Sequence, residues 1–138
     1  MKRLLLVVFI LLKYGLVSAQ LKTYNGLFED GSAKYTYKEN GINRIFEGNF
    51  SYKSADGNKS ISGKYADDMK TGLWKADWYG FQEETNYKQG LKHGVYRVRY
   101  NDSNNEMKID AHFTLGKIDS LNFWMQTNDG RIIGGHQY

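Results

Sequence analysis

Apolar and polar residues alternate with a period of two along most of the chain. Phe46, Phe50 and Tyr52 share one set of alternate positions, while Glu47 and Lys53 lie among the polar residues between them. Successive side chains of a β-strand point to opposite faces, so this alternation predicts strands with one apolar face. No window of the chain shows a convincing helical stripe. We therefore expect an all-β protein.

The alternating segments are short and regularly spaced. We expect strands at 46–53, 59–65, 74–78, 96–100, 107–115 and 121–125, and short strands around 27–28 and 35–37. Asp-Gly and Asn-Gly dipeptides, which favour tight hairpin turns, lie between several of these segments. They are Asp30-Gly31, Asn40-Gly41, Asp56-Gly57 and Asp129-Gly130. This organisation predicts an antiparallel meander of consecutive β-hairpins.

An internal repeat accounts for the spacing. Residues 65–78 superimpose on residues 87–100, with an offset of 22 residues. In both copies an aromatic residue is followed by glycine after seven residues, and by aromatic residues after nine and thirteen. The aromatic residues at the last two positions are Trp74 and Trp78 in the first copy, and Tyr96 and Tyr100 in the second. A single hairpin cannot bury its apolar face, so such a repeat stacks hairpin on hairpin.

Two further copies are less complete. Phe113 and Gly116 begin a third copy, in which Ser120 replaces the expected glycine. Phe50 and Gly57 begin an earlier one. Because glycine readily adopts positive φ angles, we expect the repeat glycines at turn positions. These glycines are Gly72, Gly90, Gly94 and Gly116.

The repeat resembles the MORN repeat, in the divergent bacterial form Y-x-x-G-K-x-x-G-x-W that includes antitoxin-like proteins. The matching residues are Tyr65, Lys70, Gly72 and Trp74 in one copy, and Tyr87, Gly90, Lys92, Gly94 and Tyr96 in the other. Asp68 replaces the early glycine of the first copy. The resemblance implies consecutive hairpins in one extended, curved sheet, and contacts with proteins or lipids as the function.

The N-terminus has the features of a secretory signal peptide. Lys2 and Arg3 precede the apolar run 4–12, and Val17 and Ala19 provide small residues at positions −3 and −1 of a cleavage site before Gln20. Nine residues make a helix of only about 14 Å, which is too short to cross a hydrocarbon core of about 30 Å. A retained membrane anchor is the alternative. We expect cleavage between Ala19 and Gln20, a single domain over 20–138, and export to the periplasm or beyond the cell.

Charge and composition argue against several classes of protein. The net charge of +4 includes three basic residues of the predicted signal peptide, and without them 16 basic residues stand against 15 acidic ones. A chain so balanced lacks the excess of cations that nucleic acid requires. The absence of cysteine excludes disulfides and thiol chemistry.

The sequence gives little evidence for catalytic or metal-binding groups. His93, His112 and His136 lack the spacing of metal ligands, and a calcium loop that began at Asp102 would have Met107 at its sixth position, where glycine is required. Glu83 and Glu84 are adjacent on a predicted strand and therefore point to opposite faces. No G-x-S-x-G motif is present. We expect neither an enzyme nor a bound cofactor or metal.

Aromatic residues are the strongest functional lead. Trp74, Trp78, Tyr96, Tyr100 and Trp124 are predicted to form a row on one sheet face, either as the core or as a binding surface. We expect a non-catalytic module that contacts a protein or a component of the cell envelope on this face. An envelope lipid-binding module and a small secreted hydrolase are the alternatives, although no window clusters the four or more basic residues that anionic lipid favours.

Overall fold

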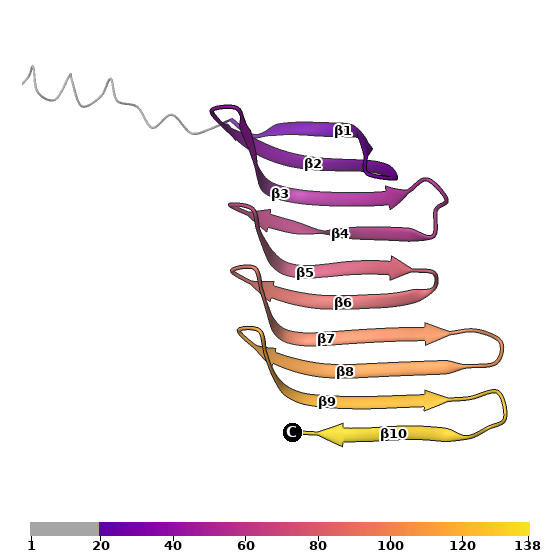
Figure 1. Ribbon diagram of the computed structural model, residues 1–138. Coiled ribbons are helices and arrows are strands. Elements are labelled where there is room, and N and C mark those ends of the chain that lie inside the picture. Colours follow the sequence, from indigo (N-terminus) through magenta and orange to yellow (C-terminus); the bar gives the residue numbers. More distant parts are fainter. Residues whose placement is uncertain (1–19) are drawn as a thin grey trace, which may run out of the picture.

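The protein forms one antiparallel sheet whose strands follow one another in chain order. The computed structural model describes residues 20–138, so the predicted signal peptide lies outside the described residues. The ten strands are β1 (Lys22–Phe28), β2 (Gly31–Asn40), β3 (Asn43–Ser54), β4 (Lys59–Ala66), β5 (Met69–Trp78), β6 (Phe81–Lys88), β7 (Leu91–Asn101), β8 (Glu106–Thr114), β9 (Lys117–Gln126) and β10 (Ile132–Gln137). Figure 1 shows β1 and β10 at opposite ends of an open, uncurled sheet. The all-β meander is confirmed.

Two of these strands were not predicted from the sequence. In β6 the residues that face the apolar side of the sheet include Glu83 and Thr85, so the expected alternation is weak. The structure satisfies both side chains locally, because the Thr85 hydroxyl donates a hydrogen bond of 2.7 Å to the Glu83 carboxylate. In β10 every residue is exposed, and no buried face shapes its composition.

Three two-residue turns lie at one end of the strands, and a fourth, Tyr79-Gly80 between β5 and β6, lies at the other. The pairs Asp67-Asp68, Gln89-Gly90 and Leu115-Gly116 connect β4 to β5, β6 to β7 and β8 to β9, and all six residues have positive φ angles. Two positive φ angles in a two-residue loop match the right-handed twist of the paired strands. Gly90 and Gly116 are therefore turn glycines, as predicted, and Asp68 adopts the same conformation with φ 61°.

Gly72 and Gly94 lie inside β5 and β7 and not in turns, which corrects the prediction. The register shifts where each of them lies, so that the odd-numbered strand contains extra residues opposite its even-numbered neighbour. Gly48 occupies the same place in β3. The φ angles are 92° at Gly48, 64° at Gly72 and 84° at Gly94. Extra residues at such a bulge bend a strand, and the odd-numbered strands bend steeply beside the left-hand hairpins in Figure 1. The bends at these three glycines therefore lie inside strands and not in the turns between them.

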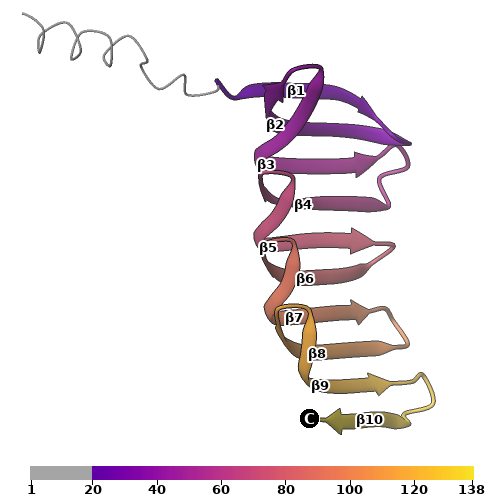
Figure 2. The same ribbon diagram turned by 60° about the vertical axis from the view of Figure 1, so that its left-hand side comes forward.

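Backbone hydrogen bonds tie each left-hand hairpin to the one before it. The amides of Asp68, Gly90 and Gly116 donate to the carbonyl oxygens of Phe46, Lys70 and Lys92, over 3.0, 3.0 and 2.7 Å. The hairpins thus stack along one side of the sheet (Figure 2). This stacking places Phe46 and Gly48 in the positions of Lys70 and Gly72. Gly48 is therefore the glycine of the earliest copy of the repeat. The prediction that Phe50 and Gly57 begin this copy is wrong.

The apolar face of the sheet carries three parallel rows of side chains. The register places one residue of every strand in each row. The upper row is Tyr24, Tyr35, Phe50, Gly63, Trp74, Thr85, Tyr96, Ala111, Leu121 and Gln137. The middle row is Gly26, Ala33, Tyr52, Ile61, Ala76, Glu83, Val98, Ile109, Phe123 and Gly135. The lower row is Phe28, Gly31, Ser54, Lys59, Trp78, Phe81, Tyr100, Met107, Met125 and Ile133. We call this the aromatic face.

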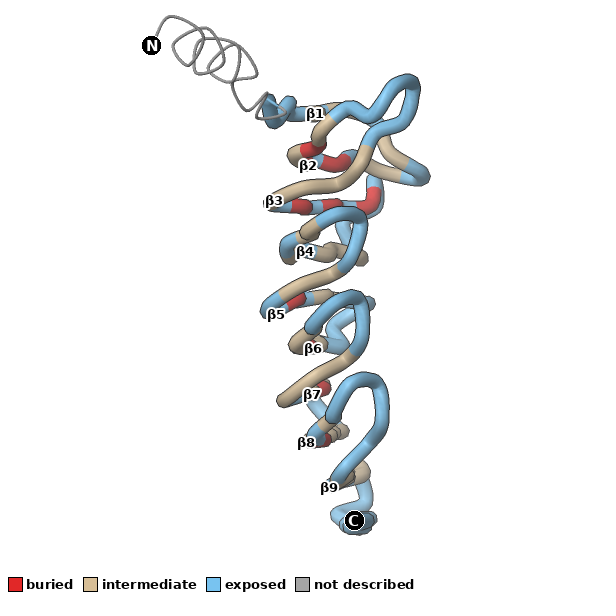
Figure 3. The backbone as a smooth tube through the Cα atoms, turned by 90° about the vertical axis from the view of Figure 1, so that its left-hand side faces the viewer, coloured by how far each residue is buried: buried red, intermediate tan, exposed pale blue. Residues whose placement is uncertain are grey.

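The core lies mainly in the N-terminal half of the sheet. Its buried residues are Ala33, Tyr35, Tyr37, Phe50, Tyr52 and Trp74, and six partly buried apolar residues pack around them. Figure 3 shows most of the buried positions on β2, β3 and β5, with few beyond β7. A single-layer sheet has no second layer to cover it, so the large aromatic rings shield one another from water.

Candidate functional site

Four of the five predicted aromatic residues share the aromatic face. Trp74 and Trp78 on β5 and Tyr96 and Tyr100 on β7 occupy its upper and lower rows. Trp124 pairs with Lys108, whose ammonium lies 4.8 Å from the indole ring, and it belongs to the opposite face. The prediction for Trp124 is therefore wrong. In β9 the residues that face the apolar side are its neighbours in sequence, among them Phe123.

Trp74 belongs to the core. Its indole is only 4% exposed and lies 4.9 Å from the ring of Tyr65 and 5.9 Å from that of Phe50. Its Nε1–H donates a 3.0 Å hydrogen bond to the Lys64 carbonyl. Trp74 and Tyr96 do not stack directly, because the small buried Thr85 lies between them in the row. The predicted row is interrupted at β6.

The lower row remains accessible to a partner. Trp78 and Phe81 are each 39% exposed, and Phe81 stacks on the half-buried Tyr100 with 4.3 Å between the ring centroids. The Tyr100 hydroxyl donates a 2.6 Å hydrogen bond to Asp102, which holds the ring in place. This bond raises the pKa of Tyr100, and together with the amides of Asn104 and Asn105 it lowers that of Asp102 to about 2. We call Trp78, Phe81 and Tyr100 the accessible row. Phe81 was missed in the sequence because β6 was not recognised.

A hollow of about 270 Å³ opens beside Trp78 on the same face. Phe28, Tyr52 and Ile61 form apolar parts of its wall, which also carries the cations Lys59 and Lys70 and the carboxylates Glu29 and Asp30. The Lys70 ammonium lies 4.5 Å from the Trp74 ring, and partial burial lowers its pKa. An apolar hollow with a few charged groups on its wall is typical of binding sites for small ligands or side chains.

Lysine recurs at one repeat position on this face. Lys92 occupies in β7 the place that Lys70 has in β5, and its ammonium lies 4.0 Å from the Tyr96 ring. Each lysine also faces an aromatic ring of the next strand, at 5.2 Å for Tyr87 and 5.4 Å for Phe113. Cations near aromatic faces are attracted to them electrostatically. The repeat lysines therefore help to order the aromatic face.

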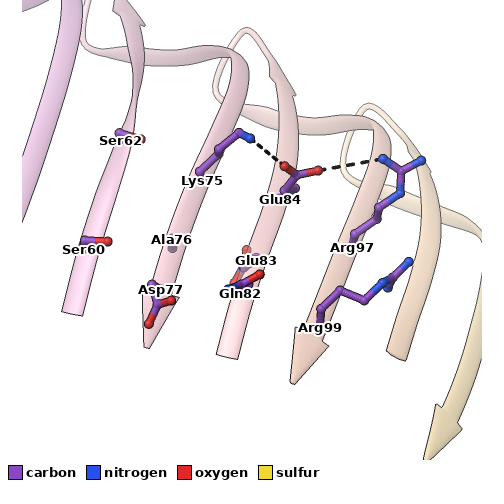
Figure 4. A pocket seen from close by; sticks show the side chains of 10 residues that line it. All are labelled: Ser60, Ser62, Lys75, Ala76, Asp77, Gln82, Glu83, Glu84, Arg97 and Arg99. Atoms are coloured by element: carbon purple, nitrogen blue, oxygen red, sulfur yellow. Dashed lines mark ion pairs between the residues drawn. The ribbon is translucent and has the colours of Figure 1, made fainter. Parts of the chain in front are cut away.

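The opposite face of the sheet is polar and carries a ladder of alternating charges. Lys75, Glu84, Arg97 and Asp110 are direct cross-strand neighbours on β5 to β8. Glu84 lies 2.8 Å from Lys75 and 3.8 Å from Arg97, as Figure 4 shows, and Arg97 lies 3.6 Å from Asp110. The contact with Lys75 lowers the pKa of Glu84. We call these four residues the charge ladder.

A second hollow, of about 460 Å³, lies beside the charge ladder. Its wall carries Ser60, Asp77 and Arg99 besides three ladder residues (Figure 4). Arg99 donates a 2.6 Å hydrogen bond to Asp110, and its guanidinium also reaches two backbone carbonyls at 2.8 Å. The cations and carboxylates on this wall balance one another in charge, so the hollow favours neither anions nor cations.

The acidic and histidine residues do not converge. Glu83 lies on the aromatic face and Glu84 in the charge ladder, as predicted for neighbours on one strand. His112 contacts Asp119 at 2.8 Å, and His136 lies beside Asn122 on another strand pair. Within residues 20–138, no group of three His, Cys, Asp or Glu side chains is arranged to hold a metal ion. The same part of the chain contains no helix long and apolar enough to cross a membrane.

No protein-family model matches the chain, and no curated protein is significantly similar to it. The resemblance to MORN repeats accordingly rests on the repeat residues themselves.

Proposed function

We propose that the protein is an exported, non-catalytic β-repeat module that binds a protein or an envelope component on its aromatic face. The observation that carries this proposal is the accessible row beside the 270 Å³ hollow. Trp78 and Phe81 expose aromatic surface, and Tyr100 is fixed by its bond to Asp102. Rigid aromatic side chains provide contact area at low entropic cost and are enriched in protein interfaces.

Two features of the sequence support the same function. The repeat resembles MORN repeats, whose hairpins contact proteins and lipids, and the segment before Gln20 has the pattern of a signal peptide. The charge ladder makes the polar face a poor surface for an anionic membrane. Lys75 and Arg97 each lie within 4 Å of a carboxylate, so little net positive charge is left on that face to attract lipid headgroups.

The decisive variant is Trp78→Ala. We expect the immobilised wild-type protein to retain partners from the envelope and secreted fractions of its host, quantified by mass spectrometry. The Trp78→Ala variant should lose them while it remains folded. Ile42→Ala is the matched control, because Ile42 is fully exposed at the β2–β3 turn, far from the accessible row. Equal recovery by wild type and Trp78→Ala would contradict binding on this face.

A lipid partner is distinguished by flotation with vesicles. Vesicles of phosphatidylglycerol and of phosphatidylcholine serve as probes, with and without added salt. Salt-sensitive binding to phosphatidylglycerol that survives Trp78→Ala would favour the lipid-binding alternative. Export is tested separately, by mass spectrometry of the mature protein, which should begin at Gln20. An intact Met1 terminus in the membrane fraction would contradict cleavage.

A further inference from the structure

Both ends of the sheet present an open strand edge. Within residues 20–138, β1 pairs with β2 alone and β10 with β9 alone (Figure 1). The registers of both pairs run without a bulge. The segment 132–137 contains no lysine and no proline, although these are the residues that commonly protect an edge strand from pairing. The β1 strand carries one lysine, Lys22, which pairs with Glu39 of the neighbouring strand. Each edge therefore offers a row of backbone groups to another strand.

The direction of the strands suits a second copy placed end to end. The meander has ten strands, so β1 and β10 run in opposite directions. A second copy in the same orientation brings its β1 beside β10 as an antiparallel neighbour. Every neighbouring pair within the sheet already has this relation. The junction would therefore continue the meander from one molecule to the next.

The rows of the aromatic face define the register of this junction. They end on β10 at Gln137, Gly135 and Ile133, and they begin on β1 at Tyr24, Gly26 and Phe28. The β4–β5 pair is an internal template, in which Ile61 pairs with Ala76 and Lys59 with Trp78. Continued rows place Ile133 opposite Phe28 of the second copy. An apolar cross-strand pair of this kind stabilises a sheet.

The same register brings the exposed apolar residues of the two edges together. Leu27 is 87% exposed on the polar face of β1, and the rows place it opposite Gly134, beside Trp124 of the first copy. Ile133 is 49% exposed and would be covered as well. Arg131, which lies 2.6 Å from Asp129 of its own chain, falls beside Glu29 and Asp30 of the second copy and brings a cation to that end of the junction.

We propose that the partner for the β10 edge is a second copy of this chain, which pairs its β1 with β10 head to tail. Such a contact uses two different surfaces and leaves one of each open on the assembly, so it adds molecules without closing. The inference goes beyond the proposed function and does not depend on it. It requires only residues of β1, β10 and the adjoining turns, and it leaves the accessible row free.

Two edge variants and their mixture test the junction. Ile133→Asp places a charge on the β10 edge, and Leu27→Asp places one on the β1 edge. We expect sedimentation of the wild-type protein to show association that increases with concentration, and each variant to weaken it by at least about tenfold. Ile42→Asp is the matched control, because it changes a fully exposed isoleucine on neither edge. Circular dichroism and thermal melts show whether each variant is folded.

The mixture identifies which edges meet. Ile133→Asp retains a free β1 edge and Leu27→Asp a free β10 edge, so together they should form a 1:1 dimer that grows no further. A wild-type protein that stays monomeric at high concentration would overturn the proposal. So would a mixture that forms no dimer, or association that resists both variants. Loss of association in Ile133→Asp alone would instead indicate pairing of two β10 strands around a two-fold axis.

Discussion

At the scale of single residues, glycine is required where the strands bend. Gly72 and Gly94 have φ angles of 64° and 84° inside strands whose other residues are extended. Side chains with a β-carbon disfavour this region, and β-branched side chains disfavour it most. No neighbouring atom comes closer than 3.8 Å to a β-carbon built on Gly94, so backbone conformation and not space restricts this position.

The variant Gly94→Val should therefore lower the free energy of unfolding by about 1–3 kcal/mol. Denaturant titration measures this change. Gly94→Asn is the graded control, because asparagine tolerates positive φ better and should cost less. Equal stability of Gly94→Val and wild type would show that the bend does not need a positive φ angle.

Burial separates the two tryptophans of β5. Trp74 is 4% exposed within the ring cluster, and Trp78 is 39% exposed in the accessible row. We expect Trp74→Ala to lower the free energy of unfolding by about 3–5 kcal/mol, and Trp78→Ala by only about 1–2 kcal/mol, since less buried area is lost. Thermal and denaturant melts of the two variants give the comparison. A larger effect at Trp78 would contradict the assignment of Trp74 to the core.

At the scale of elements, the charge ladder links four strands on the polar face. Glu84 lies between Lys75 and Arg97, with both cations within 4 Å. Each ion pair is exposed to solvent, so its contribution to stability is small on its own. The alternation of charge also disfavours shifts in strand register, because a shift would bring like charges opposite each other.

The variant Glu84→Lys would place three cations in a line across β5, β6 and β7. We expect the free energy of unfolding to fall by about 1 kcal/mol at low salt, and by less when salt screens the repulsion. Denaturant melts at two salt concentrations measure both effects. Glu84→Gln is the matched control, because it removes the carboxylate charge without adding a third cation. A loss of stability that does not depend on salt would point to packing and not to charge.

Three loops at the other end of the strands are each closed by an aspartate. Asp56, Asp102 and Asp129 accept hydrogen bonds from backbone amides two residues further along the chain, in the loops after β3, β7 and β9. Hydrogen bonds from the hydroxyls of Ser54, Tyr100 and Thr127, and then from these amides, lower the pKa of all three, to about 2 for Asp102. Aspartate in an unfolded chain has a pKa near ~3.9.

These carboxylates make stability depend on pH in acid. A pKa lowered by folding contributes stability that is complete above about pH 4 and is lost as the pH falls toward 2. We expect the urea midpoint to fall over this range. The fall should be smaller in Asp102→Asn, which can still accept the amide bonds but does not titrate. Identical pH profiles of the variant and wild type would contradict a role for Asp102.

At the scale of the whole molecule, stability is distributed unevenly along the sheet. Repeat proteins gain stability from contacts between neighbouring units, and the buried aromatic cluster lies in β2 to β5. In β8 to β10 only Ala111 is buried, and β10 is exposed throughout.

Hydrogen exchange should therefore show the strongest amide protection in β2 and β3 and the weakest in β10. The measurement is native-state exchange resolved by peptide or by residue, at a concentration low enough to keep the protein monomeric. Trp74→Ala should lower the protection of β3 to β6 more than that of β9, because its contacts are local. Uniform protection from β1 to β10 would indicate a single cooperative unit.

The sequence alone determined the all-β meander, because period-two alternation and turn dipeptides are local signals. It also placed Gly90 and Gly116 in turns and put Trp74, Trp78, Tyr96 and Tyr100 on one face. It failed at β6, where Glu83 and Thr85 satisfy each other, and at β10, which buries nothing. Both strands are stabilised by pairing with neighbours that the pattern within one segment does not reveal.

The tertiary structure decided how the strands pair, and with it the face and the neighbours of each side chain. A shift of one residue moves a side chain to the other face, so Trp124 could be assigned only once its pairing with Lys108 was known. Register also placed Gly72 and Gly94 at bends inside strands and inserted Thr85 between Trp74 and Tyr96. Burial then separated Trp74 in the core from Trp78 at the surface. Alternation along the chain specifies which residues share a face of one strand, whereas only the pairing of strands determines what each of them touches.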